Sequence, residues 1–450
     1  MRKLFRERCK CCHSGYTLML VICQCVGCNA SRVEEGTPLT LVASGDTGGW
    51  IVPCGCTSNQ SGGLLRRGGY LQQLRGEGVV LYVDVGGAAS GTSEYDRLKI
   101  EAILRGEAEM GVEAHNIGAA EANLGADFLR ETALKLGVPL LTCNVRDSRG
   151  DLLGERIRVI AAGGRKIALI GVLSDRQPVP ELQIDSPRKA ILEALDESAA
   201  DFDSLVVLAY LPEDELIELA ANLPEADLII GGPTGQSLSP RRKGPTLVAS
   251  ATNKGKFLAA LTAPASAAIR WQGEIVEMTD RFNDDPRQQT NLTEFYQTLA
   301  ERDLTPSQTS FALSLPVEIP ENFRIAGTAS CRDCHADDCD TWDRSRHAHA
   351  WESLTQTGSQ VDAYCQQCHA TGFGFPGGFE SAHRSPMHAG VGCESCHGPS
   401  HGHVQDSRIR TTYSGHARHR CTSCHDRENS PEFVVAEYWA EVRHGGREDE

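Results

Sequence analysis

The sequence predicts an α/β domain followed by a mostly helical, loop-rich domain with little hydrophobic core of its own. Between residues 37 and 265, apolar runs typical of buried strands alternate with helical stretches, and this alternation favours a sheet covered by helices. Four copies of the pattern C-x-x-C-H occur in the last 120 residues. A chain of 450 residues has room for two or three domains.

The expected strands are five apolar runs, at residues 40–44, 78–85, 166–173, 204–210 and 226–232. The helices expected between them are Leu64–Arg75, Tyr95–Arg105, Ala119–Leu136, Arg188–Leu195 and Glu213–Ala221. Residues 289–302 form one further expected helix, and residues 303–323 carry three prolines without periodicity, which indicates a linker. We therefore expect an α/β domain at 37–285, a helix and linker at 286–324 and a second domain at 325–450.

Residues 1–28 are typical of an export signal. The basic stretch MRKLFRERCK precedes the apolar run YTLMLVICQCV of 11 residues, which is too short to span a bilayer. The following CVGCNAS suits cleavage and resembles a lipoprotein box with Cys28 as the lipidated residue, so anchoring at Cys28 and ordinary cleavage nearby both remain open. We expect a periplasmic or outer-surface protein without a membrane span in its mature form.

The net charge of −16 makes nucleic acid an unsuitable partner. The acidic residues are spread along the chain, which is typical of a solvated surface.

The repeated motifs are the most specific signal in the sequence. They are Cys331-Cys334-His335, Cys365-Cys368-His369, Cys393-Cys396-His397 and Cys421-Cys424-His425, and their first cysteines are 34, 28 and 28 residues apart. C-x-x-C-H is the attachment signature of c-type haem, in which the histidine is the proximal iron ligand. Zinc or disulfides are the alternatives, but neither needs a histidine directly after each second cysteine. A fifth match, Cys9-Cys12-His13, lies in the basic export segment and is interpreted as chance.

Residues 325–450 are rich in glycine and histidine and poor in large aliphatic side chains, so four porphyrins are expected to supply their core. Nine histidines lie outside the motifs there and are candidate distal ligands: His347, His349, His383, His388, His401, His403, His416, His419 and His444. An iron with two histidines suits electron transfer, whereas an iron with an open sixth position can bind a small molecule.

Roughly residues 325–445 resemble the tetrahaem cytochrome c family of nitrification electron carriers, through segments such as CRDCHADDCDTWDRSRHAHAWESL and GVGCESCHGPSHGHV. This resemblance implies distal ligands at His347, His403 and His444. The fourth distal ligand is open among His388, His383 and Met387, or is absent altogether.

Residues 37–285 resemble the calcineurin-like metallophosphatase domain of secreted 5'-nucleotidases, through LVASGDTGGW, AHNIGAAEANLG and DLIIGGPTGQ. The resemblance implies a four-layer α/β/β/α sandwich and a two-metal hydrolytic site. Asp46 matches a metal ligand of the family. The other ligand positions are occupied by Gly48, Gly87, Ala119, Ala120, Tyr210, Pro233 and Gly235.

One carboxylate cannot hold two metals, so we predict a catalytically inactive phosphatase fold without catalytic residues. Asp84, His115 and Asn116 lie close to lost ligands, and a shifted alignment would restore one metal site at most. The stretch around Cys54, Cys56, Arg66 and Arg67 is either an anion or metal site or a glycine-rich turn with solvated arginines. Cys143 follows an apolar run and is expected to be a buried small residue.

The sequence therefore favours an exported cytochrome that carries electrons through four haems to or from a redox partner or a quinol-linked complex. The α/β domain is then a scaffold or docking module. The alternatives are a haem oxidoreductase acting on a small nitrogen or oxygen species at one open iron, and a metal-dependent phosphoesterase.

Overall fold

The computed structural model describes residues 38–53, 60–176, 178–264, 269–315 and 318–445. The expectations for the export signal, Cys28, Cys54 and Cys56 lie outside these residues.

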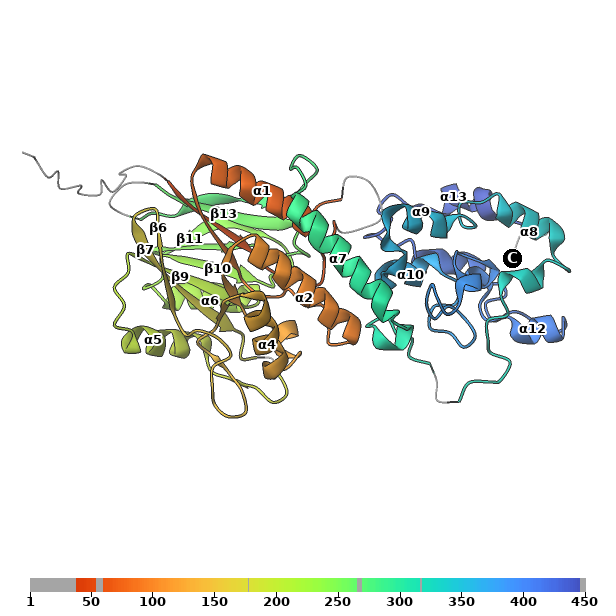
Figure 1. Ribbon diagram of the computed structural model, residues 1–450, viewed down its shortest axis with the longest axis horizontal. Coiled ribbons are helices and arrows are strands. Elements are labelled where there is room, and N and C mark those ends of the chain that lie inside the picture. The colour runs from red at the N-terminus through yellow and green to blue at the C-terminus, as the bar shows by residue number, and fades with distance from the viewer. Residues whose placement is uncertain (1–37, 54–59, 177, 265–268, 316–317, 446–450) are drawn as a thin grey trace, which may run out of the picture. The chain divides into compact units, whose positions relative to one another are not determined.

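Two six-stranded sheets form the centre of the α/β part (Figure 1). The first sheet has the order β14-β13-β1-β2-β3-β4 and the second the order β11-β12-β10-β9-β7-β6. The strands of the first are β1 (Leu39–Ser44), β2 (Val79–Asp84), β3 (Val112–Asn116), β4 (Leu140–Leu141), β13 (Phe257–Ala263) and β14 (Gln272–Glu277). Those of the second are β6 (Arg158–Ala162), β7 (Arg165–Leu173), β9 (Ser204–Tyr210), β10 (Leu228–Gly232), β11 (Leu238–Lys243) and β12 (Thr246–Ser250). A short pair, β5 (Val145–Arg146) with β8 (Gln183–Ile184), lies outside both sheets.

Alternation along the strands assigns each side chain to one of two cores. In β1, Leu39 and Leu41 belong to the core between the sheets, whereas Val42 belongs to the core under the helices. In β9, Val206 faces the inter-sheet core and Val207 packs under the second helical layer. Both faces of each sheet are therefore buried, which is why these strands read as continuous apolar runs.

Helices cover the outer face of each sheet. On the first sheet these are α1 (Leu64–Glu77), α2 (Glu94–Glu109), α4 (Ala126–Leu136) and α7 (Pro286–Arg302), and on the second α5 (Pro187–Glu197) and α6 (Glu213–Asn222). The four-layer sandwich predicted from the sequence is confirmed. Helix α7 packs against α1 and α2 and therefore belongs to the sandwich (Figure 1).

One expected helix is wrong. Residues 119–136 form two helices, α3 (Ala119–Ala122) and α4, separated by a turn at Gly125. The first helix ends at Ala122, and Gly125, whose φ of 92° favours glycine, is the N-cap of α4.

The C-terminal part is made of short helices joined by turns. They are α8 (Ala336–Asp343), α9 (Ala350–Thr357), α10 (Ala363–His369), α11 (Cys393–His397), α12 (His401–Gln405) and α13 (Val435–Val442), with the 3₁₀ turns η1 (Pro306–Gln308), η2 (Thr328–Cys331), η3 (Ser359–Val361), η4 (Pro386–His388) and η5 (Ala417–Ser423). Within the described ranges, no helix is long and apolar enough to cross a membrane.

Candidate functional site

Each C-x-x-C-H motif is wound into a helical turn. The second motif lies in α10 and the third forms α11, and in the first and fourth the histidine N–H donates to the carbonyl oxygen of the first cysteine at 2.9 Å. Residues three apart in such a turn lie on one face, so both thiols of a motif point the same way. Six of the motif cysteines are free thiols: Cys331, Cys334, Cys393, Cys396, Cys421 and Cys424.

Three motif histidines each face a histidine from a distant segment. The ring centres are 6.2 Å apart for His335 and His403, 6.1 Å for His425 and His347, and 5.9 Å for His397 and His444. Two imidazoles on opposite sides of one metal, each with its nitrogen about 2 Å from it, have ring centres about 6 Å apart. These three pairs therefore have the separation that one iron between them requires.

Hydrogen bonds orient several of these rings. The Nδ1 atoms of His369, His403 and His444 lie 2.7–2.8 Å from backbone carbonyl oxygens. A carbonyl only accepts, so Nδ1 carries the proton and Nε2 keeps its lone pair for a metal. His425 makes the corresponding contact with the hydroxyl of Ser430 at 3.1 Å.

The second motif differs from the others. Among the described residues, no histidine ring pairs with His369. His388, one of the three sequence-based candidates for this role beside His383 and Met387, lies in η4 with a buried Nδ1 that has no hydrogen-bond partner. Met387 is 71% exposed. His416 and His419 pair with each other at 6.1 Å, but neither follows a C-x-x-C.

The motifs also contact one another. The thiol of Cys331 is hydrogen-bonded to that of Cys393, which raises the pKa of Cys331 and lowers that of Cys393 to about 7. The thiol of Cys424 is likewise bonded to that of Cys368. The first motif is thus adjacent to the third, and the second to the fourth.

Glu394 ties the first and third motifs together through the backbone. Its buried carboxylate lies between Cys393 and Cys396 and accepts hydrogen bonds from the N–H groups of Ala326, Gly327 and Ser400 at 2.7–3.1 Å. Ser400 directly precedes α12, which carries His403. One carboxylate therefore holds the segments before His335 and before His403 on the same turn.

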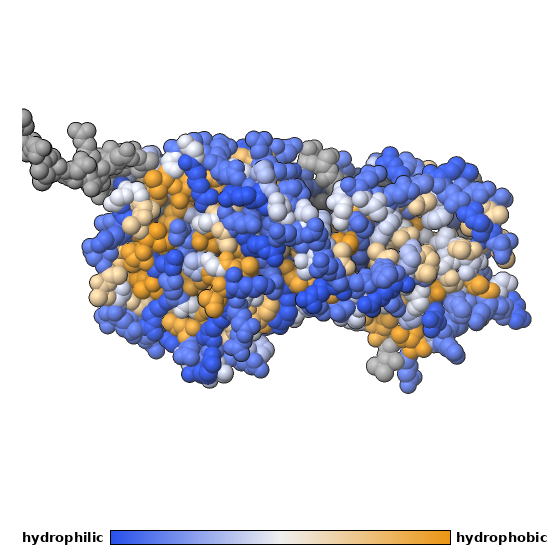
Figure 2. Space-filling model, in the orientation of Figure 1, coloured by the Kyte–Doolittle hydropathy of each residue, from blue (hydrophilic) through white to orange (hydrophobic). Residues whose placement is uncertain are grey.

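The core of this region is thin without a cofactor. Its buried hydrophobic side chains between residues 325 and 445 are Ile325, Cys339, Leu354, Ala363, Ala370, Phe373 and Phe379. Helix α13 buries none of its residues, and pale and orange atoms lie at the surface of this region in Figure 2. The motif thiols, the paired imidazoles and the exposed apolar surface together fit covalently bound porphyrins.

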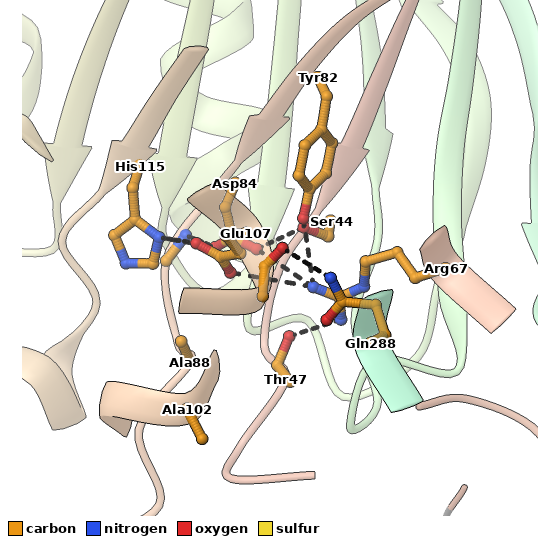
Figure 3. A network of polar contacts seen from close by, with 12 residues as sticks. Ser44, Thr47, Arg67, Tyr82, Asp84, Ala88, Ala102, Glu107, His115 and Gln288 are labelled. Carbon is orange, nitrogen blue, oxygen red and sulfur yellow. Dashed lines mark hydrogen bonds and ion pairs between the residues drawn. The ribbon is translucent and has the colours of Figure 1, made fainter. Parts of the chain in front are cut away.

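The second candidate site is a buried polar cluster at the carboxyl ends of β2 and β3 (Figure 3). Asp84 ends β2, His115 lies in β3 and Glu107 comes from α2, and their ligand atoms all lie within 4.8 Å of one another. His115 Nδ1 is 2.7 Å from Glu107 and 3.8 Å from Asp84, and its Nε2 is 3.7 Å from Glu121.

A protein cation already lies in this cluster. The guanidinium of Arg67 is fully buried, 3.9 Å from Asp84 and 3.8 Å from Glu107, and it donates to Thr47 at 2.8 Å (Figure 3). Although burial alone lowers it, the carboxylates of Glu107, Glu121 and Asp84 raise the pKa of His115 well above its ordinary value. A protonated imidazole has no lone pair to give. The donor set therefore does not fit a divalent cation, because Arg67 and His115 supply the positive charge.

This finding corrects both alternatives drawn for Arg67. Arg67 is neither on a solvated face nor available to an external anion. Arg66 is half-buried and donates to the carbonyl oxygens of Gln60 and Met278. The sequence pattern did not predict that a helix would bury an arginine beside acidic side chains at the ends of the strands.

The family's ligand positions are closed by other side chains. Asp46, the one matching ligand, accepts hydrogen bonds from Thr252 Oγ1 at 2.5 Å, Tyr210 at 3.4 Å and the N–H of Asn253 at 3.3 Å. A Cβ on Gly87 would meet the Tyr210 ring at 2.5 Å. Tyr210 stands where the family has a histidine, and its ring therefore leaves no room for the aspartate that the family has at the position of Gly87.

Comparisons with known proteins agree with both parts. Residues 330–398 match the family model of cytochrome c554 and c-prime. A 5'-nucleotidase precursor from Thermus thermophilus is similar in structure, with a TM-score of 0.53 and 23% identity over 60% of each chain.

A sulfate thiohydrolase of Thermus thermophilus, SoxB, solved with glycerol, has a TM-score of 0.52 and 18% identity over 60% of this chain and 62% of that chain. The similarity thus spans less than two thirds of either relative. At these identities, the likeness shows the fold alone. No curated protein sequence matches the chain. The chain is thus similar to cytochrome c554 and c-prime over residues 330–398, and its sandwich shares the fold of the 5'-nucleotidase precursor.

Proposed function

We propose that the chain is an exported electron-transfer protein that binds four haems through Cys331/Cys334, Cys365/Cys368, Cys393/Cys396 and Cys421/Cys424. Bound haem iron supplies one-electron oxidation and reduction. The observation that carries the proposal is the set of three imidazole pairs, each of which joins a motif histidine to a distant histidine at about 6 Å. In this proposal, His335, His369, His397 and His425 are proximal ligands, and His403, His347 and His444 are distal ligands.

The contacts between motifs suggest an order for the haems. The first and third motifs touch through Cys331 and Cys393, and the second and fourth through Cys368 and Cys424. The third and fourth motifs are also neighbours, since the charges of Cys421 and Cys424 act on Cys396. Electrons would then pass along the order first, third, fourth, second.

A haem oxidoreductase is the second candidate, and His369 favours it. In the described part of the chain this histidine has no opposing imidazole, so the second iron would keep a position open for a small nitrogen or oxygen ligand. The enclosed Arg67 and the Tyr210 ring beside Gly87 speak against a phosphoesterase.

The first experiment is the mass of the mature protein together with its ferrous spectrum, with and without carbon monoxide. We expect four covalent haems, one of which binds carbon monoxide. A mature protein without covalent haem would overturn the proposal. Four haems without any carbon monoxide binding would support the pure carrier and exclude the open second iron.

Two matched variants locate the open iron. His347→Ala should create a second carbon monoxide site, because His347 faces His425. His388→Ala should leave carbon monoxide binding unchanged, because His388 faces no motif histidine. A new site in His388→Ala would instead identify His388 as the missing distal ligand.

The mature product is expected in the periplasm or on the outer surface, either free or lipidated at Cys28. Its partner is expected to be a redox protein or a quinol-linked complex. The same mass measurement decides the lipid, since acylation and cleavage differ by far more than the error of the method.

A further inference from the structure

The loops that surround Asp46 contact the haem-attachment segments. Residues 46–50, after β1, form the first corner loop, and residues 252–254, after β12, form the second corner loop. In the metallophosphatase resemblance, the position of Asp46 is a metal ligand position. Among the described residues, the group of side chains that could hold a metal includes none from the two loops, and both loops are held by protein contacts.

Asp46 fastens the two corner loops to each other. It lies in the first loop and accepts hydrogen bonds from the side chain of Thr252 and the backbone of Asn253 in the second. Asp46, Asn253 and Lys254 have φ values of 51°, 74° and 59°. This left-handed backbone is costly for residues other than glycine and persists only where surrounding contacts impose it.

Arg67 supports the same corner from inside the sandwich. Its guanidinium donates to Thr47 in the first loop at 2.8 Å. A Cβ on Gly255, next to the second loop, would lie 2.8 Å from the Arg67 side chain. The buried cluster therefore fixes the conformation of both loops.

The first corner loop reaches the second motif. The Trp50 ring packs edge-on against the Tyr364 ring with centres 5.0 Å apart, and Tyr364 directly precedes Cys365. The Tyr364 hydroxyl donates to Asn429 at 2.9 Å, in the segment after the fourth motif. Trp50 thus contacts the residue that joins the second and fourth segments.

The second corner loop reaches the fourth motif. Lys254 Nζ donates to both carboxylate oxygens of Glu428, three residues after His425, and it also lies over the Trp50 ring at 4.9 Å. A separate contact joins the Tyr95 hydroxyl of α2 to Asp362, the residue that caps α10. The described contacts of the two corner loops with the haem region all fall on the second and fourth segments.

We propose that the two corner loops form an internal dock that seats the second and fourth haem-attachment segments, with Asp46 as its positioning residue. The two corner loops, which lie where the metallophosphatase family has its hydrolytic site, thereby set the environment of one pair of haems. They make no described contact with the first and third segments. This inference rests on the proposed binding of four haems.

The test is a double-mutant cycle on Lys254 and Glu428 in the full haem-loaded chain. The measured quantities are the four haem reduction potentials, obtained from a spectroscopic titration. Lys254→Met leaves the Glu428 carboxylate without its cation, which stabilises ferric iron nearby, so two of the four potentials should fall. Glu428→Gln should raise the same two. The double variant should return them towards the wild-type values. Lys166→Met, which breaks the exposed pair with Asp201, is the matched control and should move none.

Four unchanged potentials in Lys254→Met, or equal shifts in all four, would overturn the dock. Asp46→Ala adds a readout independent of iron. Hydrogen exchange should speed up at residues 362–369 and 425–430 and stay unchanged at 393–400. Exchange that speeds up only at residues 252–256 would contradict the role of Asp46.

Failure of the underlying function would look different. If the mass shows no covalent haem, the proposed function falls, and the exchange measurement on the same protein still decides whether the corner loops seat these segments.

Discussion

Arg67 supplies a positive charge to a corner of the fold that holds the carboxylates of Asp84, Glu107 and Glu121. A buried charge is tolerable only when it is paired, and removal of one partner from such a network typically costs about 3–5 kcal/mol. Position 67 therefore matters to folding in a way that its neighbour on the same helix does not.

Arg67→Ala should lower the free energy of unfolding of the sandwich by about 3–5 kcal/mol, because it removes one of the two buried cations that face Asp84 and Glu107. Arg66→Ala, which removes a half-buried arginine bonded only to backbone carbonyls, should cost clearly less. Urea unfolding of both variants checks this, and equal losses would show that the buried ion pairs are not the cause.

The same cluster predicts a pH dependence. Burial and the neighbouring Asp84 raise the pKa of Glu107 from 4.5 to about 7, while His115, Arg67, Asp84 and Tyr82 all face its carboxyl group. Between pH 4.5 and 7 the folded chain therefore holds a proton that the unfolded chain has released. The contribution of Glu107 to stability accordingly declines as the pH rises through this window, by about 1.4 kcal/mol for each pH unit.

Glu107→Gln should flatten this decline, since glutamine does not titrate. The measurement is the free energy of unfolding of wild type and variant at pH 5, 6, 7 and 8. Glu131→Gln on the exposed face of α4 is the control and should keep the wild-type slope. A variant slope identical to that of wild type would assign the pH dependence to other groups.

At the scale of elements, helix starts were easier to predict than helix continuity. Ser93 and Asp96 form a reciprocal capping box at the start of α2, whereas the sequence pattern ran α3 and α4 together across Gly125. The break between the two helices is short: α3 ends at Ala122, and α4 begins after Gly125, whose left-handed backbone the sequence pattern does not reveal. Strand β3 was also missed, because it is short and includes His115 and Asn116.

Ser93→Ala should destabilise the sandwich by about 1 kcal/mol, because the side chain accepts the Asp96 N–H and donates to its carboxylate. Ser186→Ala provides a matched control, since Ser186 precedes α5 without a capping side-chain hydrogen bond. Its expected effect is near zero. Urea midpoints of the two variants compare them directly, and equal shifts would remove capping as the reason.

At the scale of the molecule, the two parts obtain their stability differently. The sandwich supplies most residues of three apolar clusters, one of which also includes Ala363, Ala370, Phe373 and Phe379, whereas residues 325–445 bury few large side chains. We therefore expect the haem-binding region, and not the sandwich, to depend on its cofactors for folding.

A chain with all eight motif cysteines replaced by serine checks this expectation. Limited proteolysis should degrade the region after residue 325 and leave a resistant sandwich fragment, whereas the haem-loaded chain should resist along both parts. Resistance of the whole serine variant would show that the C-terminal region folds without haem.

The sequence by itself determined the alternation of strands and helices and the four motifs, because periodicity and motif spacing are local properties that can be read along the chain. The resemblance to the metallophosphatase family implied the four-layer sandwich and the loss of the metal ligands. Only the tertiary structure decided which histidine faces which motif, that Arg67 enters the acidic corner, and that Trp50 and Lys254 meet the second and fourth segments. These are contacts between residues far apart in sequence, such as His347 with His425, and their pairing depends on how helices and loops pack in space rather than on any local pattern.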